Sequence, residues 1–144
     1  MSTKNIPNVF IDTDVAFDIV SKREPHYSIS IELVSLVSAG KIIPYISESS
    51  ISTLIYLSEA SKLSQFEKII SQFIDICEVI SAGKKMVLDA IHSKFRDKED
   101  AIQYYTALTN NLDHFVTRNI KDYKSFSSSI PIYSPQEYLD FIEK

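Results

Sequence analysis

Short apolar runs alternate along the chain with longer segments in which apolar residues recur at helical spacing. The runs predict strands at residues 9–11, 42–46, 73–80, 114–117 and 130–133. The segments between them predict helices at residues 15–21, 26–39, 48–60, 65–72, 81–95, 99–108 and 136–142. Strands that alternate with helices form parallel βαβ units with right-handed crossovers. The pattern therefore predicts an α/β fold around a parallel sheet.

Polar residues at the start of several predicted helices support these boundaries. Ser47, Ser64 and Ser134 each precede a helix and are predicted N-caps. Asp14 directly precedes the first predicted helix, so it is either a cap or a functional acid. Asp12 comes before that cap position, and capping therefore leaves Asp12 unexplained.

The composition is that of an ordinary globular protein, with 144 residues of which 44% are hydrophobic and 24% charged. This length predicts a single domain over residues 1–144. The sequence has two glycines and no glycine-rich phosphate-binding motif, which excludes nucleotide sites of that kind. Cys77 is the one cysteine, and its apolar neighbours predict core packing. The sequence shows no signal peptide and no apolar run of spanning length, which predicts a cytoplasmic protein without a membrane partner.

Acidic and amide side chains follow two of the predicted strands and open one helix. Asp12 and Asp14 come directly after the first strand, and Asn119 and Asp122 follow the strand at 114–117. Asp100 lies in the first turn of its helix, on the face that carries the packing residues. Ligands of open α/β sheets bind beyond the carboxyl ends of the strands. We therefore expect these side chains to gather at one edge of the sheet.

Gathered carboxylates need protons or a cation to offset their repulsion. At an effective dielectric constant of about 20, two like charges about 4 Å apart repel by roughly 4 kcal/mol. Oxygen ligands without a Cys or His cluster favour Mg²⁺ or Mn²⁺ over zinc. A divalent ion in such a site can activate water and stabilise charge on a phosphate that is being cleaved. The acids therefore predict phosphodiester hydrolysis.

Three basic clusters accompany the acidic segments, although the formal net charge is −4. Clusters of this kind usually form solvated surface. Beside a phosphodiesterase site they would instead hold the nucleic-acid backbone. The clusters are Lys22/Arg23, Lys94/Arg96/Lys98 and Arg118/Lys121/Lys124, and the predicted RNA-binding residues among them are Arg118, Lys121, Arg96 and Lys98.

Four motifs in this order resemble those of the PIN-domain (PilT N-terminal) family, especially its VapC-like toxin ribonucleases. They are VFIDTDVAFDIV at 9–20, EDAIQYYTAL at 99–108, VTRNIKDY at 116–123 and IPIYSPQEYLDFI at 130–142. The resemblance implies a three-layer α/β/α sandwich with a central parallel sheet of four to five strands. It also implies an Mg²⁺- or Mn²⁺-dependent endoribonuclease that acts on RNA as the toxin of a toxin–antitoxin pair. A homodimer is a further expectation, as is an antitoxin that occupies the acidic cleft or its basic rim.

The resemblance assigns roles to individual residues as well. The implied catalytic residues are Asp12, Asp100, Asp122 and Asn119, and the implied metal ligands are Asp12, Asp100, Asp122, Asp14 and Asp97. The family's second acid usually lies on the helix after the second strand. Alignment of that helix by its apolar positions places Thr53 there, with Glu48 five residues earlier as a possible substitute. This position is where the chain departs from the family pattern.

Two other functions fit parts of the sequence. The segment IDTDV matches the nucleophile motif of haloacid-dehalogenase-type phosphatases, in which Asp12 would attack phosphorus and Asp14 would act as acid and base. That family needs a later glycine-linked acid pair, which this chain lacks. Alternatively, a PIN-like fold with an incomplete acid set would serve as a nucleic-acid or protein-binding module, and Thr53 is the feature that favours this alternative.

Overall fold

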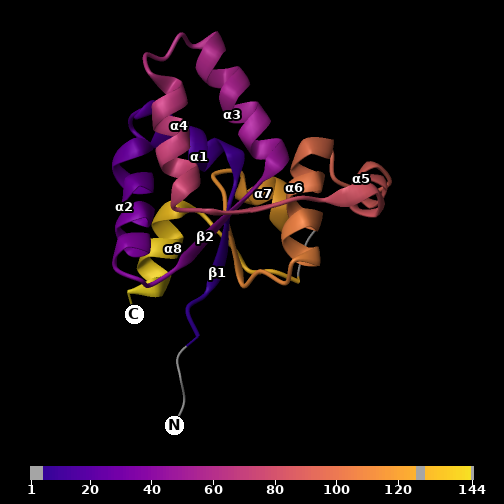
Figure 1. Ribbon diagram of the computed structural model, residues 1–144. Coiled ribbons are helices and arrows are strands. Elements are labelled where there is room, and N and C mark those ends of the chain that lie inside the picture. The colour runs from indigo at the N-terminus through magenta and orange to yellow at the C-terminus, as the bar shows by residue number, and fades with distance from the viewer. Residues whose placement is uncertain (1–4, 126–128, 144) are drawn as a thin grey trace.

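The sheet determines which side chains meet at the site. The computed structural model describes residues 5–125 and 129–143, and within them it has the strands β1 (Asn8–Ile11), β2 (Ile43–Ser47), β3 (Glu78–Ile80), β4 (His114–Val116) and β5 (Ile132–Tyr133). These strands form one sheet in the order β3-β2-β1-β4-β5, and every neighbouring pair is parallel. Figure 1 shows α2, α4 and α8 on one side of β1 and β2, and α5 and α6 on the other. The predicted parallel sheet is confirmed, with β1 at its centre.

Helices cover both faces of this sheet. They are α1 (Thr13–Ser21), α2 (Tyr27–Ser38), α3 (Glu48–Ala60), α4 (Phe66–Asp75), α5 (Gly83–Ile91), α6 (Lys98–Thr109), α7 (Ile120–Lys124) and α8 (Pro135–Ile142). Successive residues of a strand point to opposite faces. Val9 and Ile11 accordingly join a core cluster with α1, α2, α3, α4 and α8, while Phe10 joins a second cluster with α5, α6 and α7. The predicted three-layer α/β/α arrangement is confirmed.

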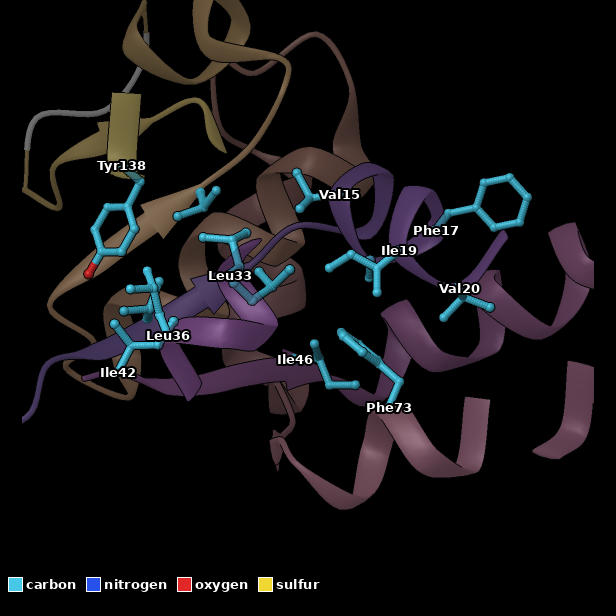
Figure 2. Close-up of a cluster of buried hydrophobic side chains, with 14 of the residues drawn as sticks. Val15, Phe17, Ile19, Val20, Leu33, Leu36, Ile42, Ile46, Phe73 and Tyr138 are labelled. Atoms are coloured by element: carbon cyan, nitrogen blue, oxygen red, sulfur yellow. The ribbon is translucent and has the colours of Figure 1, made fainter. Parts of the chain in front are cut away.

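The larger core cluster anchors α1, which begins at the site. Figure 2 shows Val15, Ile19 and Val20 of α1 directed into the same cluster as side chains of α2, β2 and α4. Val15 is fully buried and Val20 is 2% exposed. Full burial of such a side chain stabilises the fold by roughly 1.5–3 kcal/mol. Helix α1 is therefore held firmly, and so are the polar residues at its first turn.

The third predicted strand was wrong over most of its length. Residues 73–75 form the end of α4, and only Glu78–Ile80 form a strand. Ile70 and Phe73 are both buried, and their spacing of three residues places them on one face of a helix. Packing of that face against the core outweighs the local preference of the apolar run for a strand.

Other boundaries differ in detail. Ser47 caps α3, and Ser134 forms a capping box with Glu137 at the start of α8, as predicted. The predicted cap by Ser64 is wrong, because α4 begins one residue later and Gln65 occupies the cap position without a side-chain hydrogen bond. Helix α5 and strand β5 are shorter than predicted. The serine-rich segment 125–129, whose composition predicts a loop, lies mostly outside the described residues.

Candidate active site at the carboxyl end of the sheet

Asp12 is a buried carboxylate at the junction of β1 and α1. Its side chain is 4% exposed, and its backbone occupies the N-cap position of α1. Oδ1 accepts a hydrogen bond from the Thr13 N–H at 2.9 Å. Oδ2 accepts hydrogen bonds from the Thr117 hydroxyl at 2.8 Å and the Tyr123 hydroxyl at 3.2 Å. Asp14 was one candidate for this cap, and the structure assigns the cap to Asp12 because the helix begins at Thr13.

Burial and neighbouring charge make the Asp12 carboxyl resist ionisation. Desolvation is the largest cause, and the charges of Asp14 and Asp100 add to it, so that the pKa of Asp12 rises to about 8. The hydrogen bonds from Thr117 and Thr13 act in the opposite direction but do not compensate. Strongly raised carboxyl pKa values in a cleft mark candidate functional sites.

Asp14 lies in the first turn of α1, next to Asp12. It accepts hydrogen bonds from the N–H groups of Val15 at 2.6 Å and Arg118 at 3.3 Å. Burial raises the pKa of Asp14, while the charge of Arg118 counteracts part of this rise. The backbone after β4 therefore contacts the acids that follow β1 directly.

Asp100 reaches the same place from the first turn of α6. Its Oδ2 accepts a hydrogen bond from the Asn119 side-chain amide at 3.3 Å. Burial is the largest cause that raises the pKa of Asp100, to about 6, and the charge of Asp97 is the next. Asp14 and Asp122 also raise the pKa of Asp100, although each contributes less.

These side chains open into one pocket of about 360 Å³. Its walls include Asp12, Asp14, Asp100 and Asn119, which the sequence analysis had placed at one edge of the sheet, and also Glu99 and Gln103. The last two were not predicted. Gln103 is 1% exposed, and a buried polar residue on the packing face of a helix was the one available signal.

The other predicted acids lie outside the pocket wall. Asp97 is the N-cap of α6 and accepts hydrogen bonds from the N–H groups of Glu99 and Asp100 at 2.9 and 3.1 Å. Asp122 is exposed in the first turn of α7, where its charge still raises the pKa of Asp100. Glu48 is exposed in the first turn of α3. Their predicted roles as metal ligands or fourth acid stay predictions.

Thr53 of α3 contacts Glu99 of α6, which lines the pocket. Its hydroxyl lies 3.0 Å from Glu99 Oε1 and 3.2 Å from the Ser49 carbonyl oxygen, so one proton is shared between two acceptors. The position expected to hold an acid therefore holds a hydroxyl that contacts one.

Two predicted RNA-binding residues have other partners in the structure. Arg118 Nε donates to Asp18 Oδ2 at 2.6 Å, and Arg23 binds the same carboxylate at 2.9 Å. Lys98 Nζ donates to the carbonyl oxygens of Ser93 and Phe95 at 2.9 and 2.8 Å. Arg96 and Lys121 are exposed near the start of α6 and α7.

Asp18 is a structural acid that the sequence analysis missed. It is fully buried in α1, one turn after Asp14, and receives both Arg118 and Arg23. A charged residue inside an otherwise apolar helix was a usable signal, because buried carboxylates are almost always paired. This ion pair ties the segment after β4 to α1 and so holds the Arg118 N–H against Asp14.

The donor set of the pocket fits a hydrated divalent cation. Among the residues that the structure describes, no three His, Cys, Asp or Glu side chains are close enough to enclose an ion together. Mg²⁺, however, usually binds through one or two carboxylates and keeps several waters. Asp12 and Asp100 supply two such carboxylates. The charge of Asp100 raises the pKa of Asp12, and a bound cation would relieve this repulsion.

The described segments contain no helix that combines the length and the apolar character needed to cross a membrane.

Comparison with known proteins identifies the family. Ribonuclease VapC1 of Aquifex aeolicus (strain VF5) is 28% identical over 142 residues, which cover 94% of this chain and 96% of that protein. The VapBC2 structure from Rickettsia felis, bound to a promoter DNA fragment, superposes with a TM-score of 0.67 at 19% identity, over 87% of this chain and 96% of the other. The structure of Mycobacterium tuberculosis VapC20, a sarcin–ricin loop cleaving toxin, superposes with a TM-score of 0.64 at 10% identity, over 85% of this chain and 99% of the other. The structural likenesses show a shared fold. A family model described as PIN domain matches residues 8–121, and the chain therefore belongs to the PIN domain family.

Proposed function

We propose that this chain is an endoribonuclease that hydrolyses RNA with Mg²⁺ or Mn²⁺ in the pocket between α1, α3, α6 and Asn119, the residue that precedes α7. The observation that carries the proposal is the convergence of Asp12 and Asp100, which are 88 positions apart in the sequence and have raised pKa values. Membership of the PIN domain family supports it, as does the name of the relative Ribonuclease VapC1.

Asp12 and Asp100 would hold the cation, with Asp14 and Asn119 beside them and Asp122 at the rim. When bound, a divalent cation would activate water and stabilise the charge that develops on the phosphate. Thr117 and Tyr123 donate to Asp12 Oδ2 and so fix the orientation of that carboxylate.

The surrounding residues orient the acids and the RNA. The Asn119 amide donates to Asp100 and holds one of its oxygens. Arg96 and Lys121 are exposed and carry the proposed contacts to RNA phosphates. Arg118 contributes through position, because its guanidinium group binds Asp18 and its N–H binds Asp14.

We further propose that the chain is the toxin of a toxin–antitoxin pair, with an antitoxin protein as its partner. Two solved proteins of the same fold support this: the VapBC2 complex from Rickettsia felis and a toxin–antitoxin complex from Klebsiella pneumoniae. A homodimer in the cytoplasm remains part of the proposal on the grounds of the family resemblance.

Cleavage of a mixed RNA pool tests the nuclease. Wild type is compared with Asp12→Asn in Mn²⁺, in Mg²⁺ and in EDTA, and Asp75→Asn serves as a control because Asp75 is exposed at the end of α4. We expect metal-dependent cleavage by wild type and Asp75→Asn, and its loss in Asp12→Asn. Equal cleavage by all three proteins would indicate a contaminant and refute the assignment.

The binding-module alternative rests on Thr53, which occupies the position of the expected second acid. Under this alternative, wild type would cut no RNA, and Mn²⁺ would leave its melting temperature unchanged. The phosphatase alternative is disfavoured by the family match and by the absence of the later glycine-linked acid pair that it needs.

A further inference from the structure

A hydrogen bond joins α3 to α6 beside the pocket. The Thr53 hydroxyl of α3 lies 3.0 Å from Glu99 Oε1 of α6. The two residues are 46 positions apart in the sequence, and Glu99 lines the same pocket as Asp12 and Asp100. The contact joins a carboxylate of the pocket wall to the α3 position at which the family pattern expects an acid and this chain has a hydroxyl.

We propose that Glu99 is the acid that replaces the missing carboxylate of α3, and that Thr53 is its positioning residue. This inference rests on the proposed function, since it concerns the same cation and the same pocket. It assigns to α6 two consecutive acids with separate partners: Asp100 contacts Asn119, and Glu99 contacts Thr53.

The first turn of α6 explains how neighbouring residues reach two walls. Consecutive residues on an α-helix project about 100° apart, since about 3.6 residues make one turn. The Asp97 side chain accepts hydrogen bonds from the N–H groups of both Glu99 and Asp100, and these bonds fix the backbone of this turn. One capped turn can therefore present Asp100 toward Asn119 and Glu99 toward Thr53 of α3.

A buried polar network sets the distance between α3 and α6. Gln103 lies one turn after Glu99 on α6, accepts a hydrogen bond from the Ser47 hydroxyl and donates to Ser49 Oγ at 3.1 Å. Ser47 is the N-cap of α3 and is 1% exposed. These hydrogen bonds connect the start of α3 to the first turns of α6, and they therefore hold Thr53 and Glu99 in position relative to each other.

The same hydrogen bond would also form if its role were only to stabilise the packing of α3 against α6. The structural role and the role in cation binding differ in whether they require the negative charge of Glu99. A fastening contact needs a hydrogen-bond acceptor, which a glutamine also supplies. A role toward the cation needs the negative charge of Glu99, because a carboxylate attracts a divalent ion and its water shell far more than an amide does.

Calorimetric titration with Mn²⁺ alone, without RNA, separates these roles. The variants are Glu99→Gln, Thr53→Val, and the double variant Glu99→Gln/Thr53→Asp, which moves the charge to α3. Glu67→Gln is the matched control, because Glu67 is an exposed glutamate in the first turn of α4, as Glu99 is in α6. Thermal unfolding in EDTA verifies that each variant is folded.

We expect Glu99→Gln to raise the Kd for Mn²⁺ by about tenfold to a hundredfold, the range found for groups that support metal ligands. The double variant should recover most of this loss, Thr53→Val should lose several-fold, and Glu67→Gln should match wild type. An unchanged Kd in Glu99→Gln beside normal Mn²⁺ binding by wild type would overturn the inference and leave the proposed function standing. Failure of wild type to bind Mn²⁺ would overturn both.

Discussion

Replacing Asp12 with Asn should stabilise the metal-free protein, and the effect should grow with pH. The folded-state pKa of Asp12, about 8, lies above the ordinary value of 3.8. The carboxyl therefore binds a proton more tightly in the folded chain, so its favourable contribution is complete below about pH 4 and is lost as pH rises through about 8. Asn carries no charge at any pH and escapes this loss.

The structure sets the size of the effect. Near pH 7 about three pKa units of the shift are in play, which at about 1.4 kcal/mol per unit gives an upper limit of roughly 4 kcal/mol. Asn has only one acceptor oxygen, so it cannot serve both the Thr13 N–H and the hydroxyls of Thr117 and Tyr123, and Asp14 and Asp100 share the repulsion. We therefore expect a net gain of about 2 kcal/mol near pH 7 and little gain near pH 4.

Urea denaturation in EDTA at several pH values measures this gain. Asp75→Asn is the control, because Asp75 is exposed at the end of α4 and its replacement should leave stability nearly unchanged at each pH. A gain for Asp12→Asn that is the same near pH 4 and near pH 8 would refute the reasoning, and so would a loss at both. Saturating Mn²⁺ should reverse the order, because an ion bound by wild type stabilises only the folded chain that holds it.

Two further replacements examine the frame around the site. Asp18→Asn removes the buried charge that binds Arg118 and Arg23. It should lower the free energy of unfolding by about 2–3 kcal/mol, a loss limited because the partly exposed arginines recover some hydration. Urea denaturation measures the loss, and an unchanged midpoint would contradict the structural role of the ion pair. Ser134→Ala removes the capping box of α8 and should cost about 1 kcal/mol in the same assay, whereas Ser134→Thr should retain most of it.

Much of the fold follows from the sequence because the sheet is covered on both faces. Strands that are buried on two sides appear as short apolar runs, and β1 and β4 were located within a residue of their ends. Strand β3 is at the edge of the sheet, with Glu78 and Val79 exposed, so the same rule did not locate it. The apolar residues before it belong to the buried face of α4 instead.

The acids of the pocket could be brought together from topology alone, because parallel strands end at a common edge. Glu99 and Gln103 could not be assigned to the pocket in this way. Their partners Thr53 and Ser47 lie 46 and 56 residues away, and spacing within one helix carries no information about such contacts. Asp18 was likewise recognisable as unusual, but only the structure supplies its partner Arg118, which is 100 residues away.

The bonds around Asp12 also determine when the pocket can form during synthesis. Its partners Thr117 and Tyr123 lie 105 and 111 residues further along the chain, and its own N–H binds the carbonyl oxygen of Val116. Contacts between such distant residues are slow to form, because the loop between them must close first. A ribosome must therefore release residues through Tyr123 before Asp12 can be enclosed. A partly translated chain carries the early acid in water, and the finished pocket arises only after most of the polypeptide has left the exit tunnel.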